Sequence, residues 1–464
     1  MRHLLLVAAD RVFAFRFRKA RPCDNKGKGS SMASTADAHE ETSPADTTPD
    51  TVGPTAGDAG RIASLDFIRG LAVMGILAAN IVAFGQPFAA YMYPDAFMTP
   101  HGSAEETMWI AQFVLIDGKM RALFTLLFGV GLYIFMERAW AKGATRWLQV
   151  RRLLWLGLFG LLHYFFIWNG DILFLYAVAG LCVLPFIKMT ARGQLILGLI
   201  TYVAGGLLYL GIGWSMEMAE SGAFATSEQE AAEMQAEMEK GKQEKLTDSR
   251  EDAQAIIAGD YAGFVAHNFR DNATDLLFLL IMFWMETWPL MLIGMALYRM
   301  GLFEGRFARG KQAGWALAGL AVGGVLSLLI ALRVQAMDFS YYSALAAFIG
   351  WSHFPRLMMG LGLLALLALV GAGILGWLGE RISAAGRAAF TNYLGTSVLM
   401  LFVFHGWGLG LFGDLTRGQL YLVVLGTCAL MLLWSKPWLE RFRFGPLEWL
   451  WRCLTYGRAF PLRR

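Results

Sequence analysis

Long apolar stretches recur along the chain, and most of them are about as long as a bilayer is thick. A helix needs about 20 mainly apolar residues to cross the hydrocarbon core. The pattern therefore predicts an all-α, polytopic membrane helix bundle with about ten transmembrane helices. The predicted helices are 64–86, 110–136, 152–168, 172–190, 194–214, 275–299, 313–333, 342–371, 386–406 and 418–438.

Two of these segments are longer than a straight span needs and contain residues that interrupt helices. Segment 110–136 contains Gly118 between charged residues, and segment 342–371 contains Pro355 between a histidine and an arginine. Gly and Pro at such positions are typical of kinked or broken helices. In a membrane protein, polar groups at a break face protein or water rather than lipid. Both segments are therefore expected to be broken.

Three regions lie outside this pattern. Residues 24–60 are rich in Ser, Thr, Pro, Gly and Asp, and the whole of 1–60 is expected to form a disordered N-terminal tail before a transmembrane domain, 61–464. Residues 215–274 are rich in Ala, Glu, Gln, Met and Lys and are expected to form a helical insert. The run 444–458 is too short to span. Its Trp, Tyr and Arg residues fit either an in-plane interfacial helix or a lid over a ligand.

The composition excludes an ordinary water-soluble enzyme. Of the 464 residues, 56% are hydrophobic and 16% are charged, whereas soluble domains carry about 25% charged residues. The net charge of +4 conceals a segment from Glu217 to Asp275 with 14 acidic and 5 basic residues. The rest of the chain is therefore strongly basic, which indicates membrane topology rather than nucleic-acid binding.

Lys and Arg alternate between the predicted loops. They are frequent after the second, fourth, sixth, eighth and tenth predicted helices and almost absent from the loops after the first, third, seventh and ninth, such as 87–107. Basic loops face the cytoplasm in membrane proteins. We therefore expect an even number of spans, both termini in the cytoplasm, and the acidic insert 215–274 outside.

The four cysteines do not indicate a disulfide framework or a metal site. They are far apart in the sequence, and no CxxC motif or Cys/His cluster is present. We expect them to be small apolar packing residues, and the sequence gives no indication of a metal or a tightly bound cofactor.

Charged and polar residues within apolar segments are candidates for a functional site, because a charge at the bilayer centre costs about 2.5–3.5 kcal/mol. Asp66 and Arg69 are three residues apart and are expected to pair. They form either the anchored start of a helix or an anion-binding mouth. Asn80 lies deeper and is either a helix–helix hydrogen bond or a site residue. Lys119 and its charged neighbours either line a cavity or pair internally.

Histidines near the predicted outer face are candidates for acid–base chemistry. His101, in the loop 87–107, is either a solvated histidine or a general base. Asp171 precedes an apolar helix and is either its N-cap or a carboxylate that orients His101. Secondary candidates, which together indicate a polar central cavity, are His163, Glu286, His353, Arg356 and His405.

Several separated motifs, in order, resemble those of the YeiB-like bacterial membrane proteins, a family known as a domain of unknown function. The resemblance covers roughly residues 61–464. The motifs are Leu65–Gly70 with Gly75–Leu77 and Asn80, Leu123–Gly131, Asn169–Leu173 with Tyr176, Gly386-Arg387 with Thr391–Tyr393, and Phe444–Arg458 with Pro461.

The family is grouped with transmembrane acyltransferases similar to lysosomal heparan-glucosaminide N-acetyltransferase. This resemblance implies transfer of an acyl group from cytoplasmic acyl-CoA, such as acetyl-CoA, to an acceptor at the external face. It also implies a multi-pass protein of the bacterial cytoplasmic (inner) membrane. Asn80 and His101 match in kind and order an Asn and an outer-loop His of that relative.

The leading hypothesis is an acyl-CoA-dependent transmembrane acyltransferase. His101 would act as the base, Asn80 would stabilise the oxyanion and Asp171 would orient the histidine. Arginines would bind the phosphates of acyl-CoA. The residues expected to contact acyl-CoA or the substrate are Asp66, Arg69, Lys119, Arg387, Asn392, Tyr393, Glu448 and Arg452.

Two other classes of function remain open on the sequence alone. Broken helices and buried charges also fit a transporter or exporter of a small polar metabolite, and a scaffold would leave those charges paired with one another. The expected partners are the lipid bilayer and a small-molecule substrate, not a nucleic acid, and the sequence is compatible with a homodimer.

Overall fold

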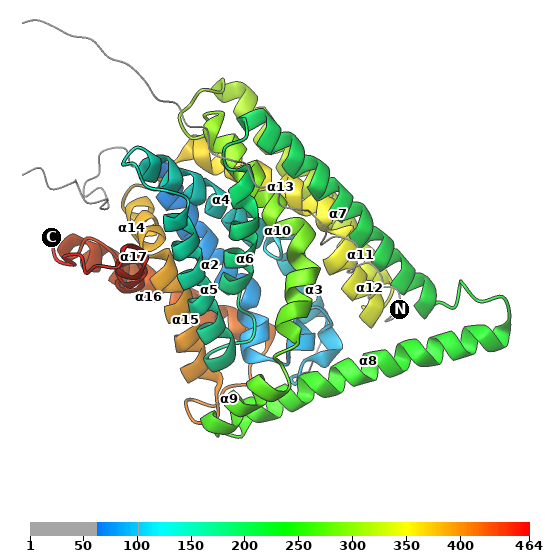
Figure 1. Ribbon diagram of the computed structural model, residues 1–464. Helices are drawn as coiled ribbons and strands as arrows, with labels where there is room; N and C mark the ends of the chain where they lie inside the picture. Colours follow the sequence, from blue (N-terminus) through cyan, green and yellow to red (C-terminus); the bar gives the residue numbers. More distant parts are fainter. Residues whose placement is uncertain (1–62, 101) are drawn as a thin grey trace, which may run out of the picture. The chain divides into compact units, whose positions relative to one another are not determined.

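The computed structural model describes residues 63–100 and 102–464, which form helices joined by short connections (Figure 1). The tail expected at 1–60 and His101 lie outside the described residues. The α-helices are α2 Ala63–Gly85, α3 Ser103–Leu115, α4 Lys119–Trp140, α5 Trp147–Phe166, α6 Leu173–Val183, α7 Ala191–Glu220, α8 Glu228–Ile257, α9 Tyr261–Arg270, α10 Asp275–Arg299, α11 Arg309–Ala336, α12 Tyr341–Ala346, α13 His353–Val370, α14 Gly376–Arg387, α15 Ala389–Phe404, α16 Arg417–Arg441 and α17 Pro446–Tyr456.

The all-α membrane bundle expected from the sequence is confirmed. Within the described residues, seven helices are long and apolar enough to cross a membrane, and eight if one bent pair of helices counts as a single span. All ten predicted segments are helical, but α5 and α6 are not among these spans. α5 contains Arg151 and Arg152, and α6 is a helix of 11 residues. A count of ten spans therefore remains a prediction.

The two expected helix breaks are present, and the structure adds a third. The second segment divides into α3 and α4 at Gly118, which adopts a left-handed conformation with φ 71°. The eighth divides into α12 and α13 around a π-helical turn, Ala347–Trp351, and π-turns often mark functional sites. The ninth is the bent one: α14 and α15 meet at Ala388 with an angle of 83° between them.

Helices α2 and α14 approach each other closely because glycines stand at their contact. A Cβ atom at Gly70 would lie 2.0 Å from the carbonyl oxygen of Ile382, and one at Gly386 would lie 1.8 Å from that of Asp66. Small residues allow such backbone approach between membrane helices. The contact places Asp66 and Arg69 of α2 next to Arg387, which follows Gly386 directly.

We expect Gly386→Ala to destabilise the protein by about 1–3 kcal/mol or more, because overpacking of a close contact forces the backbones apart. Gly426→Ala is a matched control, since a Cβ at Gly426 of α16 meets nothing within 4 Å. Alanine there should be neutral or slightly stabilising. The midpoint of thermal unfolding in detergent measures both changes. Equal midpoints for the two variants would contradict the close contact.

The insert expected to be helical is confirmed as helical and consists of α8 and α9. α8 runs across the lower end of the other helices in Figure 1, whereas α14 and α17 lie away from it. His267 of α9 lies between two carboxylates, with Nε2 2.6 Å from Asp252 and Nδ1 2.8 Å from Asp271. The hydroxyl of Tyr342 donates to the Met238 carbonyl of α8 over 2.7 Å. The Asn268 amide of α9 donates to the Phe165 carbonyl of α5 over 3.1 Å, so both helices of the insert contact the bundle.

Candidate functional site

A cavity of about 420 Å³ opens at the end of the bundle where α4 and α16 end and α5 begins. Its walls come from α2, α4, α5, α6, α10, α14, α15, α16 and α17. This volume lies in the range of small-molecule sites, about 300–1,000 Å³. The loops around its mouth are those that the distribution of Lys and Arg assigns to the cytoplasm.

The cavity is strongly basic. Seven basic and two acidic side chains line it: Arg69, Arg138, Lys142, Arg152, Arg387, Arg443, Arg452, Asp66 and Glu448. Arg138, Lys142 and Arg443 are exposed at the mouth, and the other four basic residues are half-buried. Arginine binds phosphate with paired, charge-assisted hydrogen bonds. The excess of positive charge therefore fits an anionic ligand with more than one phosphate.

The expected pair in α2 is present, and it belongs to this cavity. Arg69 Nη1 lies 3.1 Å from Asp66 Oδ1 and 3.5 Å from the carbonyl oxygen of Gly386. Arg152 of α5 lies between two aromatic rings, 4.5 Å from the centroid of Phe135 and 4.3 Å from that of Trp451. Both guanidinium groups are thus held in position before any ligand binds.

The C-terminal helix α17 forms one wall of the cavity, as the lid interpretation of 444–458 requires. Glu448, Trp451, Arg452 and Tyr456 of α17 line the cavity. The Trp451 indole donates to the Arg152 carbonyl over 2.8 Å. Through Arg452 and Trp451, α17 brings a cation and an aromatic ring to the same opening.

The deep end of the cavity is apolar and aromatic. Phe124 and Phe128 of α4, Leu173 and Tyr176 of α6, and Tyr393 of α15 line it. The arrangement fits an elongated ligand with phosphates at one end and an uncharged or apolar group at the other.

The structure places other predicted site residues away from this cavity. The Asn392 side chain donates to the Ala385 carbonyl over 2.9 Å and to Ser435 Oγ over 3.2 Å, and accepts from the Trp434 indole over 2.9 Å. These bonds join α14, α15 and α16. Asn80 is half-buried on α2 and does not line the cavity.

Lys119 belongs to a separate buried polar group at the break between α3 and α4. Its ammonium group donates to the Phe113 carbonyl. Next to it, Asp117 accepts from the amide of Gln112 over 3.1 Å, and the carbonyl oxygen of that amide accepts from Arg417 over 2.7 Å. The charges of segment 110–136 are therefore engaged internally, which is one of the two alternatives expected for them.

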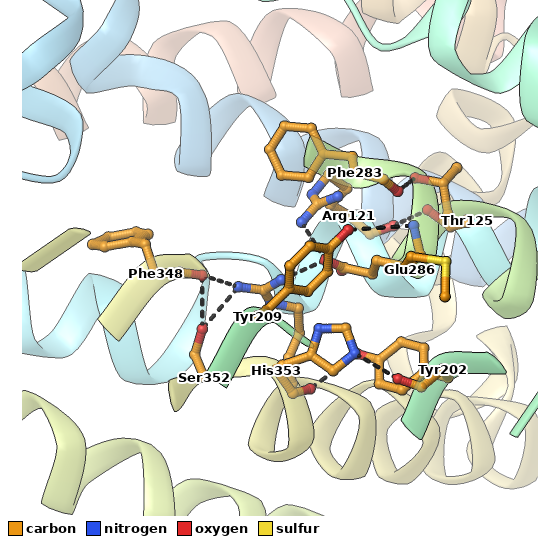
Figure 2. Close-up of polar contacts among 12 residues, drawn as sticks. Arg121, Thr125, Tyr202, Tyr209, Phe283, Glu286, Phe348, Ser352 and His353 are labelled. Atoms are coloured by element: carbon orange, nitrogen blue, oxygen red, sulfur yellow. Dashed lines mark hydrogen bonds and ion pairs between the residues drawn. The ribbon is translucent and has the colours of Figure 1, made fainter. Parts of the chain in front are cut away.

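A second buried network surrounds Glu286 in α10. Its Oε2 atom accepts from Arg121 Nη2 over 3.0 Å and from Arg356 Nη1 over 2.6 Å. Figure 2 shows Arg121 beside Glu286 and His353 next to Tyr202, whose carbonyl oxygen lies 3.1 Å from His353 Nε2. Three secondary candidates, Glu286, His353 and Arg356, are thus brought together, and none of them lines the basic cavity.

Asp171 contacts a different histidine from the one proposed on the sequence. Its Oδ1 atom lies 2.8 Å from Nδ1 of His163, and its Oδ2 atom accepts from the Phe174 N–H over 2.8 Å. The second bond satisfies an N–H of the first turn of α6, as an N-cap would, although the N-cap position itself is Ile172.

A small pocket of about 30 Å³ lies at the other end of α5. Its lining includes Trp168, Asp252, His267 and His405. The ring centroids of Phe264 and His405 are 4.7 Å apart, and His405 is a buried, packed histidine.

Comparison with known proteins identifies the family. Residues 297–458 match the family described as "Protein of unknown function (DUF418)". The chain is also 31% identical over 426 residues to the uncharacterized protein YeiB of Escherichia coli (strain K12), which covers 86% of this chain and 98% of YeiB. The chain belongs to the YeiB-like DUF418 family. This DUF418 protein is an integral membrane protein, as its apolar helices require.

A second relative extends the same likeness. The DUF418 protein is 28% identical over 424 residues to the uncharacterized protein YxaH of Bacillus subtilis (strain 168), covering 87% of this chain and 96% of YxaH. No solved structure matches the chain. The matched family region, 297–458, contains α14 to α17 and so includes the Arg387, Glu448 and Arg452 side of the cavity.

The sequence of this DUF418 protein did not reveal every residue of the cavity. Arg138, Lys142, Arg152 and Arg443 line the cavity, but in the sequence they indicate only membrane topology. The sequence pattern does contain an indication of this site, because four basic residues near helix ends on the predicted cytoplasmic side can together face one anionic ligand. The aromatic lining gave no such signal, since Phe and Tyr at helical spacing are typical of ordinary packing.

Proposed function

We propose that this protein is a transmembrane acyltransferase that binds acyl-CoA in the basic cavity and transfers the acyl group to an acceptor at the opposite face. The observation that carries the proposal is the order of charged and apolar residues along the cavity. Seven basic side chains surround the opening, and an apolar, aromatic end follows. Acyl-CoA has the same order of groups, with phosphates at one end and a thioester on a long uncharged arm.

The residues have distinct roles in this proposal. Arg69, Arg387 and Arg452 bind phosphate, and α17 covers the ligand from the cytoplasmic side. The acyl thioester lies at the aromatic end, next to Tyr176 and Tyr393. The arm of the ligand thus follows α5 inward from the level of Arg152.

A phosphate-binding cavity makes a direct prediction for the double variant Arg387→Ala/Arg452→Ala. Each charged hydrogen bond is worth about 1.5–3 kcal/mol, so we expect acetyl-CoA affinity to fall at least about 100-fold. Affinity should also fall as salt rises. Equilibrium binding of acetyl-CoA to the purified full-length protein in detergent measures both effects.

Arg309→Ala is the matched control, because Arg309 is an exposed arginine at the start of α11 outside the cavity. It should bind acetyl-CoA like the wild type. Release of the free CoA thiol from acetyl-CoA, with glucosamine or water as acceptor, then tests transfer. A wild-type protein that does not bind acetyl-CoA, or that binds it and releases no CoA, would overturn the proposed function. Tight binding of a phospholipid headgroup in its place would assign the cavity to a lipid phosphate.

The second candidate is a transporter of a small polar metabolite, and the Glu286 network favours it. A carboxylate held between Arg121 and Arg356 within the membrane domain is the type of group that marks substrate or ion pathways. This function predicts solute flux into proteoliposomes without consumption of acetyl-CoA, whereas the acyltransferase predicts release of CoA.

A further inference from the structure

A buried histidine–carboxylate pair lies at the junction of α5 and α6. His163 and Asp171 are eight residues apart, and the Trp168–Asp171 connection folds back so that Nδ1 and Oδ1 are 2.8 Å apart. Both side chains are fully buried. Asp171 is fixed in turn by the Phe174 N–H, 2.8 Å from its other oxygen. The carboxylate therefore sets the orientation of the imidazole.

The opposite nitrogen of this imidazole has no partner. Nε2 of His163 is buried and makes no hydrogen bond to any residue that the structure describes. A buried polar atom is nearly always hydrogen-bonded, and an exception calls for an explanation. A histidine with one nitrogen held by a carboxylate and the other free has the geometry of a general base.

The pair also lies between the two pockets. The His163 ring is 5.4 Å from the ring of Tyr393, which lines the basic cavity, and 6.3 Å from that of Trp168, which lines the small pocket at the far end of α5. His163 is 11 residues beyond Arg152 on the same helix, about 17 Å along its axis. The His163 ring thus lies next to one aromatic ring from the lining of each pocket.

We propose that His163 is the catalytic base of the acyl transfer and that Asp171 is its positioning residue; this inference rests on the proposed function. The acceptor is an amine or a hydroxyl that reaches His163 from the side of Trp168, and the thioester reaches it from the side of Tyr393. Either approach requires the corresponding ring to turn away. In the closed arrangement the two rings keep water from the base.

The transfer balances without a further reactant. Nε2 of His163 takes the proton of the acceptor as the acceptor atom bonds to the thioester carbonyl carbon. The carbon–sulfur bond then breaks, and the imidazolium returns the proton to the CoA sulfur. The products are the acylated acceptor and CoA with a free thiol, and the histidine is neutral again. Asp171 stabilises the imidazolium formed between the two steps.

The neighbouring glycine shows how closely the pair is packed. A Cβ atom at Gly160 would lie 2.8 Å from Oδ2 of Asp171 and 2.3 Å from the backbone nitrogen of Phe174. A side chain at position 160 has no space here, so the packing of the pair requires glycine there. Asp171→Asn keeps the size and removes the charge.

The test compares binding with turnover in the full-length protein, using acetyl-CoA with glucosamine or water as acceptor. We expect His163→Gln to lower the rate of CoA release at least about 100-fold, with the acetyl-CoA dissociation constant within about 3-fold of wild type. Asp171→Asn should lower kcat in the same way and leave binding unchanged. Retained binding shows that the variants are folded.

Tyr164→Phe is the matched control. Tyr164 is the residue next to His163, and the substitution removes one buried hydrogen bond, which the Tyr164 hydroxyl donates to the Asn272 carbonyl over 2.7 Å. Its rate of CoA release should stay within about 3-fold of the wild-type rate. If the wild type releases CoA and the His163→Gln variant releases it equally fast, this inference is overturned and the proposed function is unaffected. If the His163→Gln and Asp171→Asn variants both lose acetyl-CoA binding as well as turnover, the pair has a structural role. A wild type that neither binds nor consumes acetyl-CoA would overturn the proposed function itself.

Discussion

Glu286→Ala is expected to destabilise the protein by about 3–5 kcal/mol, the usual cost of removing one member of a buried ion pair. Glu286 Oε2 accepts from both Arg121 and Arg356, at 3.0 and 2.6 Å, and its side chain is 2% exposed. Without the carboxylate, two guanidinium groups remain inside the bundle without their anion. Unfolding in mixed detergent micelles gives the change in free energy.

Two other variants separate the effect of the charge from that of the packing. Glu286→Gln keeps one oxygen acceptor and should lose less stability than the alanine variant. Arg121→Met/Glu286→Met/Arg356→Met removes all three charges and should recover part of the loss, because well-packed apolar residues often replace buried ion pairs at little cost.

Glu244→Gln is the control for this series, since Glu244 lies 4.0 Å from Lys240 on the exposed face of α8. It should change nothing measurable. If Glu286→Ala unfolds with the wild-type free energy, the network is hydrated, and a water-filled pathway through the bundle becomes the better explanation. The same result would strengthen the transporter function.

The helices and two of their breaks could be predicted because they depend on neighbouring residues. Apolar length gives the spans, Gly118 gives the break between α3 and α4, and Pro355 lies in the first turn of α13, which follows the π-helical turn. The bend at Ala388 could not be predicted in this way. It depends on the contact between Gly386 and α2, more than 300 residues away in the sequence.

The partners of the site residues were the part that the sequence left open. Asp66 and Arg69 lie one helical turn apart, so their pairing followed from helix geometry. Asp171 was expected to orient His101, and its contact with His163 instead depends on how the connection between α5 and α6 folds. Amphipathic residues at 444–458 predict a surface helix, but not which surface. The surface that this helix covers is determined by the contact of α17 with α15, which Glu448 forms.

Glu448→Ala is expected to cost about 2–4 kcal/mol and to release α17 from the cavity, because three donors lose their acceptor. Glu448 Oε1 accepts from the backbone N–H groups of Phe390 and Thr391, at 2.7 and 3.1 Å, and Oε2 accepts from the Thr391 hydroxyl at 2.6 Å. These backbone groups belong to the first turn of α15, which lacks partners within its own helix. Limited proteolysis near 444–458 and thermal unfolding measure the release. Glu440→Ala, at an exposed position near the end of α16, is the control.

The protonation of Glu448 adds a pH dependence with a defined sign. Glu448 lies outside the membrane-spanning segments, and burial raises its pKa above the ordinary value of 4.5 despite the bonds from Thr391 and Phe390. The native state therefore binds this proton more tightly than the unfolded chain does. Its contribution to stability is complete below the unfolded-state pKa and is lost as pH rises through the folded-state pKa. Glu448→Gln cannot titrate, so the stability of the wild type relative to this variant should fall with rising pH. A difference that stays constant, or that grows with pH, would show that the carboxylate keeps its water and that α17 is held by its aromatic contacts with α5 instead.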